Sequence, residues 1–95
     1  MSWSVYLLRC RDGSFYCGIT TDLTRRLKQH RAGHGSKYVR SRLPVMLAFR
    51  LSCDSRSQAL KTEAWIKKLS RAQKKALAFP AIYGFGGIDG EMQKV

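Results

Sequence analysis

Apolar side chains near the start of the chain form two short segments that flank a turn signal. Residues 4–10 and 14–19 are rich in aliphatic, β-branched and aromatic side chains, which predicts two β-strands. The Arg-Asp-Gly sequence at 11–13 predicts a hairpin between them. A two-residue turn would place Tyr6 and Tyr16 on opposite faces, whereas a three-residue loop with a left-handed glycine would place them on one face. We favour the three-residue loop because the other face then gathers an apolar core set: Val5, Leu7, Phe15, Cys17 and Ile19.

The apolar spacing then changes to four residues, which is typical of a helix. Leu23 and Leu27 form an apolar stripe, and the polar residues at 20–22 can cap the first turn. Gly33 is a natural stop for a helix. We therefore expect this helix to end near Ala32.

The middle of the chain predicts a loop followed by a third strand. Residues 33–43 contain glycines and many basic side chains, which is typical of an exposed loop. Pro44 then precedes a third strand at 45–52. The apolar run in this strand predicts burial on both faces of the sheet.

Two more helices are predicted after the third strand. The polar segment 54–57 can cap the first of them, whose apolar positions are Ala59, Leu60, Ala64, Ile66 and Leu69. The Ser-Arg-Ala-Gln sequence at 70–73 forms a capping box for a short further helix, which we expect Pro80 to end. We therefore expect one domain at 1–80 and a glycine-containing tail at 81–95 that is loosely ordered or docked.

Charge and composition narrow the class of partner. The 95 residues are enough for one domain, and 18 Lys and Arg against 6 Asp and Glu give a net charge of +12. This excess favours a polyanion such as nucleic acid. The three cysteines lack the spacing of a zinc site or a disulfide framework, which indicates a reduced, cytoplasmic protein. The sequence shows no secretory signal pattern and no apolar run long enough for a membrane span.

Five side chains with chemistry suited to phosphodiester cleavage lie along the predicted elements: Tyr6, Tyr16, Arg26, His30 and Glu63. The arginine and the histidine are four residues apart, so they lie on one face of the first predicted helix. Taken alone, each residue has an ordinary structural explanation. Glu63, for example, precedes Lys67 by four residues, and such a helical pair contributes about 0.3 kcal/mol. Their joint occurrence in a basic chain is what favours a nucleic-acid site.

In this ordered set the chain resembles the GIY-YIG nuclease superfamily, and in particular its short, stand-alone bacterial branch. The resemblance runs from about Val5 to Leu77, with Gly35-Ser36-Lys37-Tyr38 in its middle and Gly18 after the second tyrosine. It implies an α/β fold in which a three-stranded antiparallel sheet is flanked by about three helices. It also implies a phosphodiesterase that uses one divalent metal ion, Mg²⁺ or Mn²⁺.

The resemblance also implies a role for each catalytic position. Glu63 would hold the metal ion, which acts as a Lewis acid on the phosphate and the leaving oxygen. Arg26 would bind the scissile phosphate, for which its planar, bidentate guanidinium is well suited. Tyr16 would orient or deprotonate the attacking water, and Tyr6 would line the same site.

Other positions either match the family pattern or depart from it. His30 matches a helix position that holds an aromatic or imidazole group in other members, and Gly18 would let a backbone come close. The chain has Ser4-Val5 in place of the Gly-Ile of the first triplet, and it has Ile19 where the excision-repair relatives carry a lysine. It also contains no asparagine, whereas many relatives have one downstream of the glutamate.

Nucleic-acid contacts are expected mainly from the basic segment that precedes the third strand. This segment alternates basic residues with aromatic or apolar ones, a pattern that suits phosphate contact and base stacking. We expect contacts from residues in it and from one lysine on a later helix: Lys37, Tyr38, Arg40, Arg42 and Lys67. The expected partner is nucleic acid, with DNA favoured over RNA and the choice between them left open. A protein partner and the oligomeric state are left open.

Three hypotheses follow from the sequence. The leading one is a metal-dependent endonuclease that acts on DNA in a branched, damaged or single-stranded form. The alternatives are a non-catalytic nucleic-acid-binding module and an interaction domain, each within a repair or recombination assembly. For the enzyme, we expect Tyr6, Tyr16 and Arg26 to meet in one solvent-open cleft with Glu63 on its rim.

Overall fold

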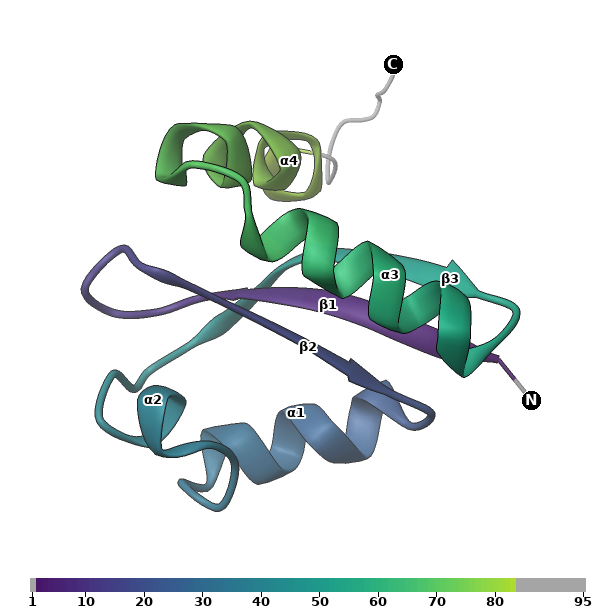
Figure 1. Cartoon of the computed structure of the whole chain (residues 1–95). Helices are drawn as coiled ribbons and strands as arrows, with labels where there is room; N and C mark the ends of the chain where they lie inside the picture. The colour runs from purple at the N-terminus through teal and green to yellow at the C-terminus, as the bar shows by residue number, and fades with distance from the viewer. Residues whose placement is uncertain (1, 84–95) are drawn as a thin grey trace.

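Three antiparallel strands form the central sheet of the computed structural model, which describes residues 2–83 (Figure 1). The central strand β1 (Trp3–Arg9) lies between β2 (Phe15–Thr20) and β3 (Met46–Cys53), and both outer strands are antiparallel to it. The predicted α/β class with a three-stranded antiparallel sheet is therefore confirmed.

Helices cover the two faces of this sheet (Figure 1). One face carries α1 (Leu23–Arg31) and the single-turn helix α2 (Lys37–Arg40), and the other carries α3 (Arg56–Lys67) and α4 (Arg71–Tyr83). The predicted capping residues begin the longer helices: Asp22 caps α1, Ser55 caps α3, and Ser70 and Gln73 bond reciprocally as a capping box before α4. None of these helices is long and apolar enough to cross a membrane, within the part of the chain that is described.

The hairpin between β1 and β2 has the three-residue loop that the sequence favoured. The Cys10 backbone N–H donates to the Ser14 carbonyl at 2.8 Å, and Gly13 has a φ of +82°, which is the left-handed region. Leu8 consequently pairs with Tyr16, so Tyr6 and Tyr16 share a face. The predicted apolar set lies on the opposite face and packs against Ala59 and Ile66 of α3.

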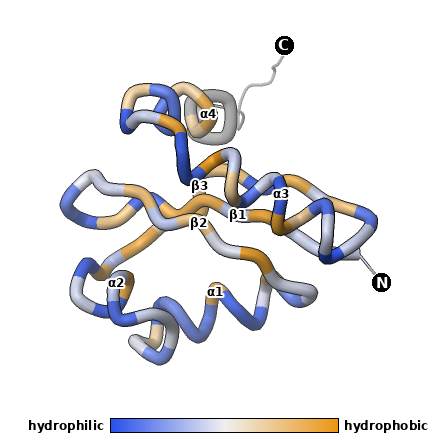
Figure 2. Tube along the Cα trace, viewed as in Figure 1, coloured by the Kyte–Doolittle hydropathy of each residue, from blue (hydrophilic) through white to orange (hydrophobic). Residues whose placement is uncertain are grey.

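The face that carries the tyrosines forms a second apolar core, which sequence analysis did not predict. Its buried members come from β1 and from the segment between α1 and β3: Tyr6, Leu8, Cys10, Val39 and Val45. Leu23 and Leu27 of α1 pack against them. Apolar residues gather along the strands between the two helical layers, whereas α1 is mainly polar apart from these two leucines (Figure 2).

Three local predictions were wrong. Residues 33–43 contain α2 and are not wholly a loop, because the Ser36 hydroxyl accepts from the Val39 N–H and Val39 is buried beneath the sheet. The strand β3 is not buried on both faces, because its apolar residues Met46 and Leu51 are exposed.

The helix α4 continues through Pro80 to Tyr83 and does not end there, so the predicted boundary at residue 80 falls inside a helix. The rest of the predicted tail, residues 84–95, lies outside the described part of the chain.

Candidate functional site

A buried hydrogen bond joins the first tyrosine of the predicted site to the histidine of α1. The Tyr6 hydroxyl lies 2.8 Å from His30 Nε2, and the two side chains are only 1% and 0% exposed. The other ring nitrogen, His30 Nδ1, is also buried and has no hydrogen-bond partner among the described residues. The hydrogen bond to Tyr6 is therefore the one that the imidazole makes among the described residues, and it joins α1 to β1.

Two further aromatic rings extend this pair toward the surface. Tyr16 of β2 is partly buried, with its ring centroid 5.4 Å from that of His30 and 6.4 Å from that of Tyr6. Tyr38 of α2 stacks on Tyr16 at 6.2 Å and is 37% exposed. The cluster thus runs from the buried Tyr6 outward through Tyr16 to Tyr38.

Two glycines make room for this cluster. A Cβ atom on Gly18, which pairs directly with Tyr6 across the strands, would lie 2.5 Å from the Tyr6 Oη and 2.7 Å from its Cζ. A Cβ on Gly35 would lie 2.8 Å from the His30 Cε1 and 2.9 Å from its Cγ. The structure thus gives Gly18 a packing role against Tyr6, and its expected contact with nucleic acid stays a prediction.

Arg26 places a positive charge beside the buried pair. Burial raises the pKa of the Tyr6 hydroxyl, and the neighbouring Arg26 guanidinium opposes that shift only in part. Burial, and then the charge of Arg26, lower the pKa of His30 from its usual 6.5. At neutral pH the cluster therefore holds a neutral phenol and a neutral imidazole, with one guanidinium next to them.

Glu63 lies on the other side of the sheet from these residues. It belongs to α3, and its charge is the second cause, after burial, that raises the pKa of the Cys17 thiol to about 11. Cys17 is part of the core beneath α3, while its neighbour Tyr16 points to the opposite face. The side chain of Glu63 is 18% exposed and pairs with Lys67 at 3.4 Å.

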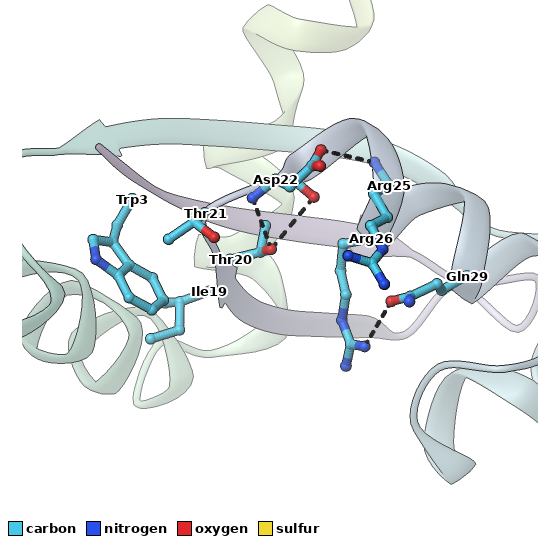
Figure 3. A pocket seen from close by; sticks show the side chains of 8 residues that line it. All are labelled: Trp3, Ile19, Thr20, Thr21, Asp22, Arg25, Arg26 and Gln29. Carbon is cyan, nitrogen blue, oxygen red and sulfur yellow. Dashed lines mark hydrogen bonds between the residues drawn. The ribbon is translucent and has the colours of Figure 1, made fainter. Parts of the chain in front are cut away.

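The expectation of one solvent-open cleft is therefore wrong for Tyr6, which is almost fully buried. The structure does bring Tyr6, Tyr16, Arg26 and His30 together. Glu63 lies on the opposite face of the sheet, on the other side of the outer strand β2. An open cavity does lie beside Arg26, at the junction of β2 and α1 (Figure 3).

Arg42 has a structural role that sequence reasoning missed. Its guanidinium carbon lies 3.8 Å from the centre of the Tyr38 ring, and its Nε donates to the Asp12 carboxylate at 3.1 Å. It also donates from Nη1 to the Tyr38 carbonyl at 3.1 Å. Hydrogen bonds from Ser14, and then Arg42, lower the pKa of Asp12. Arg42 thus covers one face of Tyr38 and ties α2 to the β1–β2 loop.

The remaining basic residues of the predicted interface lie at the surface. Lys37 and Arg40 are exposed on α2, close in sequence to Tyr38. Lys67 is 57% exposed at its side chain and belongs to the α3 side with Glu63. Contacts of these residues with nucleic acid stay predictions.

The fold is that of a GIY-YIG catalytic domain, and the model of that family matches residues 2–76 of the chain. The chain therefore belongs to the GIY-YIG family, within the group of single-domain UPF0213 proteins. The family implies nuclease activity, a nucleic-acid substrate and, typically, a divalent metal ion.

Relatives and solved structures support this placement. A UPF0213 protein of Halobacterium salinarum is 53% identical over 73 residues, which cover 77% of this chain and 95% of that protein. One from Vibrio cholerae is 50% identical over 88 residues, 92% of this chain and 83% of the relative. The solution NMR structure of a UPF0213 protein from Bacillus halodurans has a TM-score of 0.57 at 36% identity and covers 99% of this chain and 100% of its own. A structure from E. faecalis has a TM-score of 0.58 at 42% identity over 87% of this chain and 90% of its own.

Proposed function

We propose that this protein is a metal-dependent endonuclease that hydrolyses phosphodiester bonds in DNA. The observation that carries the proposal is the arrangement of Arg26 of α1 and Tyr16 of the outer strand β2 beside a buried, hydrogen-bonded Tyr6–His30 pair. The net charge of +12 supports a polyanionic substrate.

Of the four catalytic candidates on the tyrosine face, Arg26 and Tyr16 are the two that are partly exposed, so a substrate can reach them. The Arg26 side chain is partly buried and donates to Gln29 Oε1 at 3.1 Å from Nη1, which holds the guanidinium in one direction. Its remaining N–H groups can hold two oxygens of the scissile phosphate in a bidentate way. Tyr16 is partly exposed, so its hydroxyl can hold the attacking water next to that phosphate. Tyr6 and His30 position both groups and do not meet the substrate.

Glu63 is the residue that would hold the metal ion. No three His, Cys, Asp or Glu side chains of residues 2–83 gather into a metal site, so a site enclosed by protein ligands does not fit. A single carboxylate does fit Mg²⁺, which keeps several waters and uses substrate phosphate oxygens as further ligands. The Lys67 contact at 3.4 Å is long and its lysine side chain is 57% exposed, so the Glu63 carboxylate can exchange it for a cation. When bound, the metal would neutralise charge on the phosphate and on the leaving oxygen.

The two halves of this site would meet around the free edge of β2. Because β2 is an outer strand, no other strand of the described residues pairs with that edge. A phosphodiester lying along it would contact Arg26 from the α1 side and approach Glu63 from the α3 side. This placement explains why the candidate ligand and the candidate phosphate clamp belong to opposite faces.

Cleavage assays with a pair of α3 variants test the proposal. Purified protein is incubated with single-stranded, duplex, branched and abasic DNA and with matching RNA, in Mg²⁺, Mn²⁺ or EDTA. We expect metal-dependent cleavage of at least one DNA form, and its loss in Glu63→Gln. Lys67→Gln is the matched control, because it breaks the same ion pair while keeping the carboxylate. It should still cleave at saturating DNA.

Two outcomes would contradict this assignment. Cleavage that survives both EDTA and Glu63→Gln would belong to a contaminating nuclease. Salt-sensitive DNA binding without cleavage of any form, in either metal, would instead establish the non-catalytic binding module.

A further inference from the structure

A cavity of about 350 Å³ lies where β2 ends and α1 begins (Figure 3). Arg26 and Gln29 line one end of it from α1 and are joined by their hydrogen bond. Trp3 and Ile19 lie next to each other at the other end and come from the strands. One end of the cavity is therefore cationic and polar, while the other is aromatic and apolar.

The cavity extends around the end of β2 from one face of the sheet to the other. Trp3 and Ile19 pack against the core beneath α3. Arg26 belongs to α1 on the opposite face, where its charge acts on the Tyr6 hydroxyl. A nucleotide chain lying in the cavity would therefore run from the tyrosine side of the sheet toward the side that holds Glu63.

We propose that this cavity binds one unpaired nucleotide next to the scissile phosphate, with the phosphate on Arg26 and the base against Trp3 and Ile19. The proposal rests on the proposed function and narrows its substrate class to a strand whose base at the cut is unpaired. A cationic group combined with an aromatic ring is how proteins hold single strands. The volume is near the lower end of the range for small-ligand sites, about 300–1,000 Å³, so it admits one nucleotide. A base from a duplex would have to leave its stack to enter.

The charges around the cavity determine which end takes the phosphate. Asp22 lines its middle, where the carboxylate accepts from the Arg25 N–H at 3.1 Å and caps α1. This negative charge disfavours a phosphate in the middle of the cavity. Arg25 and Arg26 of α1 both line the cavity and supply cations at one end, and the Arg56 guanidinium stands 6.0 Å from the Trp3 ring at the other. Consecutive phosphates of one strand can therefore bind on either side of a base held at Trp3.

Tryptophan fluorescence tests this directly. The chain has two tryptophans, and Trp65 is 57% exposed on α3 and does not line the cavity. In Trp65→Phe, Trp3 is the only indole. In EDTA, titration with a short oligothymidylate should quench Trp3 saturably, while a duplex of equal length at the same concentration should not. Equal quenching by the duplex, or single-strand binding seen by anisotropy without quenching, would overturn the proposal.

A substitution at Trp3 gives a second, independent measurement. Trp3→Leu keeps an apolar side chain against the core but removes the aromatic face, and it should weaken single-strand binding about 10-fold. Trp65→Leu is the matched control and should leave binding unchanged. A set of single strands is then compared, each with one abasic position. The strand that lacks the base at Trp3 should bind the unaltered protein more weakly than the intact strand by a similar factor, and it should lose no further affinity on Trp3→Leu. Additive losses at every position would overturn the subsite.

These measurements separate the subsite from the catalytic proposal, because binding is followed without metal. Trp3 quenching in a protein that never cleaves would support the subsite and count against the endonuclease alone. Metal-dependent cleavage without a Trp3 response would leave the endonuclease intact and overturn the subsite.

Discussion

Replacing Tyr6 with phenylalanine isolates the buried contact that holds α1 against the sheet. The substitution keeps the ring and removes the hydroxyl that lies 2.8 Å from His30 Nε2. His30 is fully buried, and its Nδ1 already lacks a partner within residues 2–83, so the imidazole would then have no hydrogen bond there. Leaving a buried polar group unsatisfied costs about 1–3 kcal/mol. We expect a loss of about 2 kcal/mol of unfolding free energy.

Tyr16→Phe is the matched control for this loss. It removes the same atom from a partly exposed ring in the same cluster, so water can replace the lost contacts. Its expected cost is within about 0.5 kcal/mol. Urea unfolding of both variants measures the two costs, and an unchanged m-value shows that the native state has kept its compactness.

A double variant tests whether the unfolding free energy lost in Tyr6→Phe comes from the hydrogen bond to His30 and not from the surroundings of the Tyr6 ring. When Tyr6→Phe is combined with His30→Leu, both polar partners are replaced by apolar groups. Each change should then cost less unfolding free energy in the presence of the other than it does in the unaltered protein. If Tyr6→Phe costs no more than Tyr16→Phe, or if the two changes are simply additive, then the hydrogen bond does not hold α1 in place.

Three more predictions test other parts of the structure. Gly18→Ala should destabilise the fold by about 1–3 kcal/mol in urea unfolding, because the added Cβ would press on the Tyr6 ring. His30 is held neutral in the fold, so as the pH drops the unfolded chain takes up a proton on this histidine before the folded chain does. The unfolding free energy should therefore fall below about pH 6.5, and His30→Leu should remove that dependence. Replacing the exposed Lys37 and Arg40 together with alanine should flatten the slope of log affinity against log salt for duplex DNA by up to about 1.8, and an unchanged slope would exclude both from phosphate contact.

Local rules were sufficient for the hairpin and for the helix starts. The alternation of apolar residues on β1 and β2 allowed only one loop length that gave a continuous core, and Gly13 has the backbone conformation this loop needs. Asp22 and the Ser70 capping box act on N–H groups within three residues of themselves. Such features are readable from sequence because both partners lie in one short segment.

Features that depend on distant partners were not predictable in this way. The Arg42 clamp joins residues 30 positions apart, and nothing in the basic segment distinguished Arg42 from Arg40 as a phosphate ligand. The exposure of Met46 and Leu51 on β3 depends on which parts of this strand the distant helices cover, which its own apolar run does not encode. The position of Glu63 across β2 likewise follows from which face α3 covers.

The residues that carry the sequence resemblance to the family have two different physical roles in this structure, and the two roles bear differently on whether the protein is an enzyme. Tyr6, His30 and Gly18 form one packed unit, in which the phenol needs the imidazole as partner and the glycine as space. A chain that had lost catalysis would keep all three in order to keep its fold. Arg26 and Glu63 are different, because the cluster does not need a phosphate clamp or a carboxylate on the far side of β2. The presence of these two is therefore the stronger argument for an enzyme, and Glu63→Gln tests it, with Lys67→Gln as the control for the ion pair that both changes break.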